Sequence, residues 1–73
     1  MIEVRLFATL RKDRGKVMQL PASEFSDGVS ILEHFAIPRE EVAIFLINGF
    51  HSKPEDPVKD GDVLAIFPPV GGG

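Results

Sequence analysis

Residues 56–73 read DPVKDGDVLAIFPPVGGG, and this stretch contains a turn, a strand and a proline-glycine ending. The segment 59–62, KDGD, predicts a turn, because Gly61 can adopt a positive φ at little steric cost. The segment 63–67, VLAIF, predicts the last strand, since it is rich in branched and aromatic side chains. Two prolines follow directly, and proline cannot donate a hydrogen bond to a sheet ladder. We therefore expect the strand to end in an extended segment that leaves the sheet.

The segment before this stretch predicts a hairpin. Residues 42–47, VAIFLI, read as a buried strand that stops at Asn48-Gly49. Asn-Gly is the strongest short-range hairpin signal, because both residues tolerate a positive φ. Residues 50–53, FHSK, are then expected to form a brief partner strand.

A change of periodicity between residues 26 and 37 predicts one short helix. Apolar residues fall there at helical spacing, with Ser26 and Asp27 as capping candidates. Pro38 should end the helix, because its ring pushes the preceding residue out of the helical region.

The first 20 residues predict a second hairpin. Between residues 2 and 10, every second residue is apolar and the intervening ones are mostly polar, as in a half-buried strand. Phe7 is the exception, an aromatic residue on the polar side. The run 17–20, VMQL, would pair with this strand. The turn between them carries Arg11, Lys12, Arg14 and Lys16. We expect these to be solvated turn residues, and a recognition patch is the less favoured alternative.

Composition limits the classes of function. With 73 residues, 44% of them hydrophobic and no cysteine, the chain predicts one globular domain without disulfides, thiolate metal sites or cysteine nucleophiles. We expect a body at 1–67 and an extended C-terminal tail at 68–73. The net charge of −3 argues against nucleic acid as a partner. The longest apolar run is far below the roughly 20 residues of a membrane span, so we expect a cytoplasmic protein with no membrane partner.

The polar side chains suggest neither a metal site nor an internal catalytic centre. His34 and His51 have no nearby cysteine and no second histidine at a helical spacing, so solvated histidines are the expected interpretation. No serine belongs to a recognisable triad motif. Glu40 and Glu41 are expected in a solvated loop or a first helical turn.

The tail is the remaining candidate for chemistry. Pro68 and Pro69 favour an extended polyproline conformation and would act as a stiff spacer. Val70 and Gly71 to Gly73 can reach about 13 Å beyond them, and glycine can thread a slot too narrow for other residues. The terminal carboxylate is ionised at neutral pH. It would become an acyl donor only after activation, for example as an acyl-adenylate formed with ATP by another enzyme.

Three stretches and their spacing resemble the small subunit of molybdopterin synthase and its relative, the thiamine-pathway sulfur carrier, the MoaD and ThiS types of sulfur carrier. They are RLFATLRKDRGK at 5–16, INGFHS at 47–52 and DPVKDGDVLAIFPPVGGG at 56–73. The most specific element is the strand-Pro-Pro-Val-Gly-Gly ending. The resemblance implies an α+β fold of the ubiquitin-like β-grasp type, with a mixed sheet of four to five strands packed on one helix.

In that family, an E1-like enzyme adenylates the terminal glycine, which is then converted to a thiocarboxylate. The sulfur passes to a pterin precursor on the large synthase subunit, or to the thiazole of thiamine made by thiazole synthase. The resemblance implies that Gly73 carries the thiocarboxylate and that Gly72 completes the diglycine. The tail residues that would present this tip are Pro68, Pro69, Val70 and Gly71. The chain would then be a co-substrate that binds no cofactor or metal, and no enzyme by itself.

The resemblance also assigns a role to two aromatic residues. Phe7 and Phe67 match positions that contribute to the docking surface for the large subunit, although both could instead fill the core. The Pro-Pro ending favours the molybdopterin branch, for molybdenum or tungsten cofactor, and the compact helical region favours the thiamine branch. A different class of function stays open as well: a ubiquitin-like protein modifier, or a plain interaction module.

Overall fold

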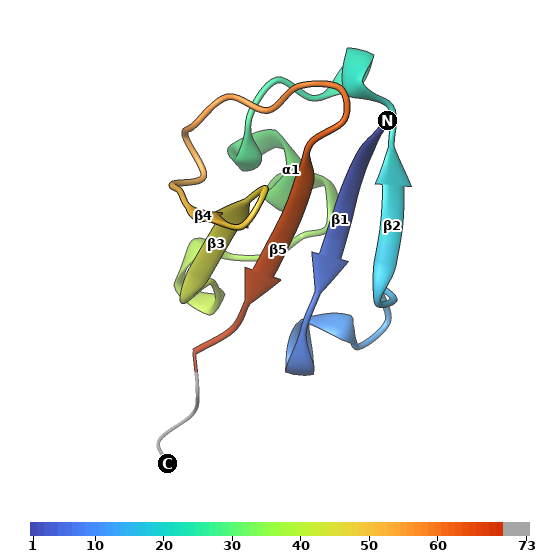
Figure 1. The fold of residues 1–73 in the computed structure, drawn as a ribbon. Coiled ribbons are helices and arrows are strands. Elements are labelled where there is room, and N and C mark those ends of the chain that lie inside the picture. Colours follow the sequence, from blue (N-terminus) through green and yellow to red (C-terminus); the bar gives the residue numbers. More distant parts are fainter. Residues whose placement is uncertain (70–73) are drawn as a thin grey trace.

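The computed structural model describes residues 1–69, and these form one mixed sheet with one α-helix. The elements are β1 (Ile2–Leu6), β2 (Val17–Leu20), α1 (Gly28–His34), β3 (Ile44–Ile47), β4 (Phe50–His51) and β5 (Val63–Phe67), with short 3-10 turns η1 (Ala8–Arg11), η2 (Ala22–Glu24) and η3 (Arg39–Glu41). The strand order is β2-β1-β5-β3-β4 (Figure 1). Strands β1 and β5 are parallel, and the other pairs are antiparallel. The predicted α+β architecture is confirmed, with five strands.

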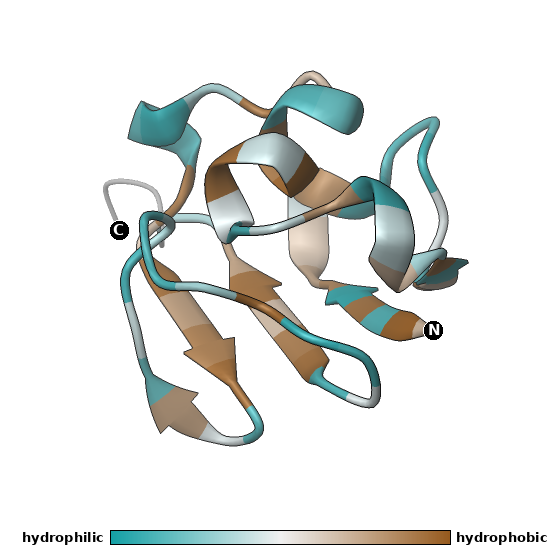
Figure 2. Cartoon of the chain, turned by 90° about the horizontal axis from the view of Figure 1, so that it is seen from above, coloured by the Kyte–Doolittle hydropathy of each residue, from teal (hydrophilic) through white to brown (hydrophobic). Residues whose placement is uncertain are grey.

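The helix covers one face of this sheet and leaves the other face open (Figure 2). In β1 the side chains alternate strictly, with Ile2, Val4 and Leu6 fully buried. Leu64 and Ile66 of β5 are buried on the same side, against the helix. Because full burial of such a side chain contributes about 1.5–3 kcal/mol, these two parallel strands are the centre of the core.

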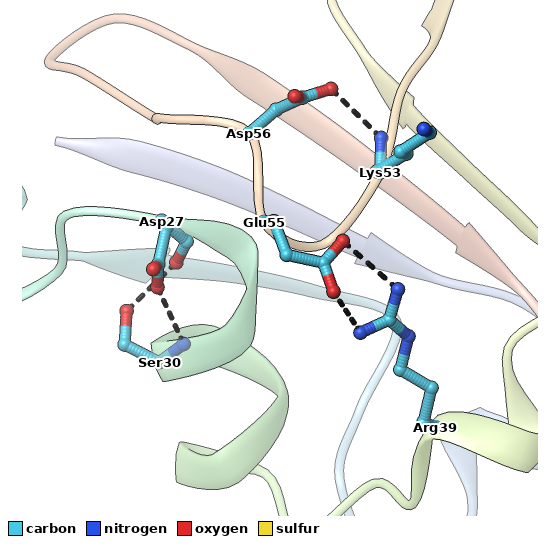
Figure 3. A network of polar contacts seen from close by, with 6 residues as sticks. All are labelled: Asp27, Ser30, Arg39, Lys53, Glu55 and Asp56. Carbon is cyan, nitrogen blue, oxygen red and sulfur yellow. Dashed lines mark hydrogen bonds and ion pairs between the residues drawn. The ribbon is translucent and has the colours of Figure 1, made fainter.

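The helix begins at a polar cap and ends at a left-handed residue. The Asp27 carboxylate accepts a hydrogen bond from the Ser30 N–H at 2.9 Å, and the Ser30 hydroxyl donates to the Asp27 carbonyl (Figure 3). Ala36 has a φ of +55°, and the Ile37 N–H donates to the Leu32 carbonyl at 2.9 Å. This is the Schellman pattern, which stops a helix. The helix is therefore shorter than the predicted range 26–37.

The start of the helix is packed too closely for any side chain. A Cβ atom at Gly28 would lie 2.5 Å from the Phe45 ring and 2.8 Å from the Pro54 carbonyl oxygen. The segment that follows Pro54 is held by an ion pair between Glu55 and Arg39, and by the Lys53 N–H, which donates to the Asp56 carboxylate at 2.9 Å (Figure 3). Glycine at this position thus lets α1 approach β3 and the loop before β5.

The first strand is shorter than predicted. It ends at Leu6 rather than continuing to residue 10, because Ala8 adopts a φ of +53° and the chain turns into η1. Leu10 is fully buried within η1, so its burial agrees with the apolar side of the predicted strand although its backbone is not extended. By contrast, the turn at Asn48-Gly49 is confirmed, since both residues have a positive φ. The partner strand β4 covers only residues 50–51 of the predicted 50–53.

Candidate functional site

Two aromatic side chains meet where β1 and β5 end. Parallel pairing sets Leu6 beside Ile66, so the next residue of each strand lies at the same edge of the sheet. The Phe7 N–H donates to the Ile66 carbonyl at 3.2 Å, which continues the ladder by one residue. The Phe7 and Phe67 rings stack with centroids 4.2 Å apart and an interplanar angle of 8°. The chain continues from this point into the tail (Figure 1).

The stacked pair lies on the open face of the sheet. Phe7 has the same strand parity as the outward-facing Glu3 and Arg5, and both aromatic rings are only half-buried. Neither belongs to the hydrophobic core. The alternative that Phe7 and Phe67 simply fill the core is therefore wrong. Their predicted role in partner binding remains a prediction.

A shallow apolar hollow of about 380 Å³ surrounds this pair, on the side of β3. Ile44 of β3, which pairs with Phe67, is 39% exposed. The remaining lining residues are Ala8, Thr9, Ala43, Pro68 and Pro69. Exposed apolar side chains gathered in this way make the hollow a candidate docking surface. The hollow lies directly at the base of the tail, because the two prolines form part of its wall.

A second hollow, of about 400 Å³, lies on the side of β2, and most of its lining side chains are charged. It shares Phe7 with the apolar hollow, and its other lining residues are Glu3, Arg5, Leu6, Arg11, Lys16 and Val17. A hydrogen bond from Arg5 is the main cause that lowers the pKa of the Glu3 carboxyl, with further contributions from the Arg5 charge and from Gln19. Glu3 is thus held in its ionised form by its neighbours.

Two arginines of the β1–β2 connection have structural roles that the sequence did not reveal. Arg14 donates to the Phe35 carbonyl at 2.8 Å, and to the carbonyls of Leu10 and Ala36 at 3.2 Å each. Arg11 donates to the Leu6 carbonyl at 2.8 Å, and its guanidinium lies 5.3 Å from the Phe7 ring centroid. The expectation of freely solvated turn residues is therefore wrong for both. The Arg14 partner at Phe35 is 21 residues away in sequence, so no local pattern could have indicated it.

The predicted chemical residues of the tail are only partly within the structure. Pro68 is half-buried and Pro69 is exposed, both at the apolar hollow. Val70, Gly71, Gly72 and Gly73 lie outside the described residues, and so does the greater part of the predicted tail at 68–73. Their assigned roles, including the thiocarboxylate at Gly73, remain predictions.

The remaining polar residues form no recognisable catalytic or metal centre within residues 1–69. In this range, no three side chains among histidine, aspartate and glutamate are grouped as metal ligands. His34 is exposed and contacts Phe25 and Phe35 edge-on, with centroids 5.2 and 4.8 Å apart. His51 is exposed on β4. No helix in the described part of the chain is long and apolar enough to cross a membrane.

Solved structures of similar shape share this architecture. SAMP1 from Haloferax volcanii is 24% identical with a TM-score of 0.75, and the alignment covers 99% of this chain and 98% of that one. A putative molybdopterin converting factor, subunit 1, from Pyrococcus furiosus is 24% identical with a TM-score of 0.65, covering 94% and 97%. These likenesses confirm the ubiquitin-like β-grasp fold.

A third structure is closer in sequence. The complex of subunits 1 and 2 of molybdopterin-converting factor from Helicobacter pylori contains a chain 28% identical to this one, with a TM-score of 0.62 and coverage of 99% and 97%. Comparison with curated proteins gave no significant match. The sequence profile of the ThiS family matches residues 4–73, nearly the whole chain. The chain therefore belongs to the ThiS family of small ubiquitin-like proteins.

Proposed function

We propose that this protein carries sulfur as a thiocarboxylate on its C-terminal Gly73 and donates it during the biosynthesis of molybdopterin for molybdenum or tungsten cofactor. The observation that carries the proposal is the stacked Phe7–Phe67 pair and its apolar hollow at the base of the Pro68-Pro69 spacer. A partner that covers this hollow would hold the body at a defined distance from its own reaction centre. Family membership and the likeness to the Helicobacter pylori complex support the same function.

The chemistry proceeds in three balanced steps that all involve the carboxyl group of Gly73. First, a carboxylate oxygen of Gly73 attacks the α-phosphorus of ATP, and pyrophosphate leaves. A sulfur nucleophile at the oxidation level of hydrosulfide then attacks the acyl carbon and displaces AMP, which leaves a thiocarboxylate. In the transfer step, the thiocarboxylate sulfur attacks an electrophilic carbon of the acceptor and displaces an oxygen leaving group from it. Water then hydrolyses the resulting acyl–sulfur bond, which leaves the sulfur on the acceptor and regenerates the Gly73 carboxylate. The carrier is thus consumed and restored in each cycle.

The partners follow from these steps. Activation needs an E1-like adenylating enzyme that binds ATP, and transfer needs the large subunit of molybdopterin synthase. If the acceptor belongs to the thiamine pathway instead, thiazole synthase takes that second place. The carrier itself binds no cofactor in this scheme and works in the cytoplasm beside these enzymes. The polar side chains described above suit this role, because their hydrogen bonds are made to other groups of the fold and they do not converge on a substrate site.

A second candidate function is protein modification. The similarity to SAMP1, a small archaeal modifier protein, favours it, since an activated C-terminal carboxyl can equally form an amide with a lysine amine. Both functions share the adenylation step and the docking hollow. They differ in the nucleophile that displaces AMP.

Intact mass spectrometry separates the two functions. The purified chain is incubated with the adenylating enzyme encoded by the same genome, ATP and a sulfide source. We expect the mass increase of one oxygen replaced by sulfur, and none in a variant lacking both Gly72 and Gly73, because deletion of Gly73 alone would leave the diglycine Gly71-Gly72. A variant extended by one alanine serves as a control, because its terminal carboxyl no longer belongs to Gly73, and we expect no sulfur incorporation. Lysine-linked adducts without any thiocarboxylate would favour the modifier function, and no change in mass would contradict both.

A further inference from the structure

Charge is distributed unevenly over this acidic protein. Residues 5–16 contain five of the eight lysines and arginines but only one of the 11 acidic residues, Asp13. The rest of the chain is therefore strongly acidic, since the net charge is −3. The basic segment comprises the end of β1 and the β1–β2 connection, at the same end of the sheet as the exit of the tail (Figure 1).

Not all of these cations serve the fold. Arg11 and Arg14 donate to backbone carbonyls, and Arg5 pairs with Glu3. Lys16 is exposed and lines the hollow on the side of β2. Among the ion pairs of residues 1–69, none involves Lys16. A lysine with this exposure keeps its charge available to another molecule.

The hollow on the side of β2 has three cationic side chains and one carboxylate in its lining, and we call it the basic hollow. It is joined to the apolar hollow through one side chain. Phe7 lines both, with Phe67 stacked on it and the Arg11 guanidinium near its ring. Together they make one surface with an apolar half beside β3 and a basic half beside β2. Apolar contact supplies affinity, whereas charges at the rim mainly set the orientation and the rate of association.

We propose that this two-part surface binds a protein partner whose matching surface is apolar opposite Phe7 and Phe67 and acidic opposite Lys16. The inference rests on the proposed function, because the partner is the adenylating enzyme, which receives the tail first. An acidic patch on the partner would be attracted to this end of the molecule and repelled by the remainder. The tail would then arrive first and in the correct direction, since charge steering acts before contact.

The test measures association of the cognate adenylating enzyme with the full chain. Lys16→Glu should weaken binding about five- to tenfold, mostly through slower association, and Lys16→Arg should retain binding. Lys53→Glu is the matched control, because Lys53 is exposed and follows β4 at the opposite edge of the sheet. The difference in association rate between wild type and Lys16→Glu should shrink as NaCl rises from about 0.01 to about 0.15 M, because the Debye length falls over this range from about 30 to about 8 Å. Lys16→Gln, which removes the charge without reversing it, provides a second variant with a smaller expected loss, and amide NMR spectra verify that each variant is folded.

A partner-free measurement separates failure of this inference from failure of the proposed function. The 15N-labelled chain is titrated with a synthetic peptide in which glutamates flank two phenylalanines, and with the same peptide carrying glutamines. We expect shifts around Phe7 and Lys16 that are larger with the glutamate peptide. Equal shifts with both peptides, or equal association of wild type and Lys16→Glu, would overturn the inference. If the wild-type chain is not adenylated but still prefers the glutamate peptide, the proposed function is contradicted, whereas the inferred binding surface is supported. Displacement of the peptide by a short RNA would assign the basic half to nucleic acid and also overturn the inference.

Discussion

The two ends of β5 differ in chemistry, although the strand is only five residues long. At its first end, the buried Asp62 carboxylate accepts hydrogen bonds from the Asn48 side-chain amide and the Lys59 N–H, both at 2.9 Å. The Asn48 side-chain oxygen in turn accepts from the Val63 N–H at 2.9 Å. Every polar atom named here is satisfied inside the fold. This end locks β5 to the turn after β3.

At the other end, β5 finishes in apolar surface that the fold leaves uncovered. Phe67 stacks on Phe7 and is followed by Pro68, and these residues line a hollow open to solvent. From this contrast we expect the Asp62 end of the strand to contribute stability and, under the proposed function, the Phe67 end to contribute partner binding. Variants at the two ends should therefore affect different measurements.

Loss of the aromatic pair should give the largest effect. The double variant Phe7→Ala and Phe67→Ala removes the centre of the hollow, where buried aromatic anchors of an interface are worth about 2–4 kcal/mol. We expect association with the cognate adenylating enzyme to weaken by roughly 30-fold or more, measured by calorimetry. Phe50→Ala is the control, because Phe50 is 75% exposed on β4 and lines neither hollow. An equal loss of partner affinity in the double variant and in Phe50→Ala would contradict a binding role of the Phe67 end.

Loss of the buried carboxylate should act on stability instead. Asp62→Ala leaves the Asn48 amide and the Lys59 N–H without their acceptor, which costs about 1–3 kcal/mol. Chemical denaturation measures the free energy of unfolding, and partner affinity of the folded fraction should not change. Asp56→Ala provides the comparison, since Asp56 accepts one hydrogen bond from the Lys53 N–H at a more exposed site. An unchanged unfolding free energy for Asp62→Ala would break the division between the two ends.

Relief of backbone strain away from both ends should raise stability slightly. Ala36 adopts a φ of +55° after α1, a conformation that costs a residue with a Cβ about 1 kcal/mol. Ala36→Gly should therefore stabilise the protein by up to about 1 kcal/mol and raise its melting temperature by about 4–8 °C. Calorimetric scanning tests this, and a lower melting temperature would contradict it. Partner binding should stay at the wild-type level.

The smallest expected effect is the pH dependence of the Asp62 contribution. Burial, the largest influence, acts to raise the pKa of Asp62, but hydrogen bonds from Asn48 and the Lys59 N–H, with the Lys59 charge, bring the pKa below its ordinary value. The folded pKa is thus lower than the unfolded value of about 3.9. The stabilisation is full above that value and is lost as the pH falls through the folded pKa. The stability difference between wild type and Asp62→Asn should narrow from about pH 5 downward, and a difference that widens would contradict the assignment.

Much of the fold was predictable because it depends on local signals. The Asn48-Gly49 turn, the strand at 63–67 and the cap at Asp27 each rest on residues within a few positions of one another. The extent of the first strand was not predictable from alternation. The chain turns at Ala8 into η1, and Leu10 is fully buried within that turn rather than on an extended strand.

The candidate site divides in the same way. The amino-acid order supplied the proline spacer, the glycine-rich ending, the absence of cysteine and the misplaced aromatic at position 7, since each of these is a property of the chain alone. Only the tertiary structure brought Phe7 onto Phe67 and joined the apolar hollow to the basic one. The two phenylalanines are 60 positions apart, and it is the parallel pairing of β1 with β5 that makes them neighbours. No local pattern encodes such a pairing, because it forms only when both strands are buried beneath the same helix.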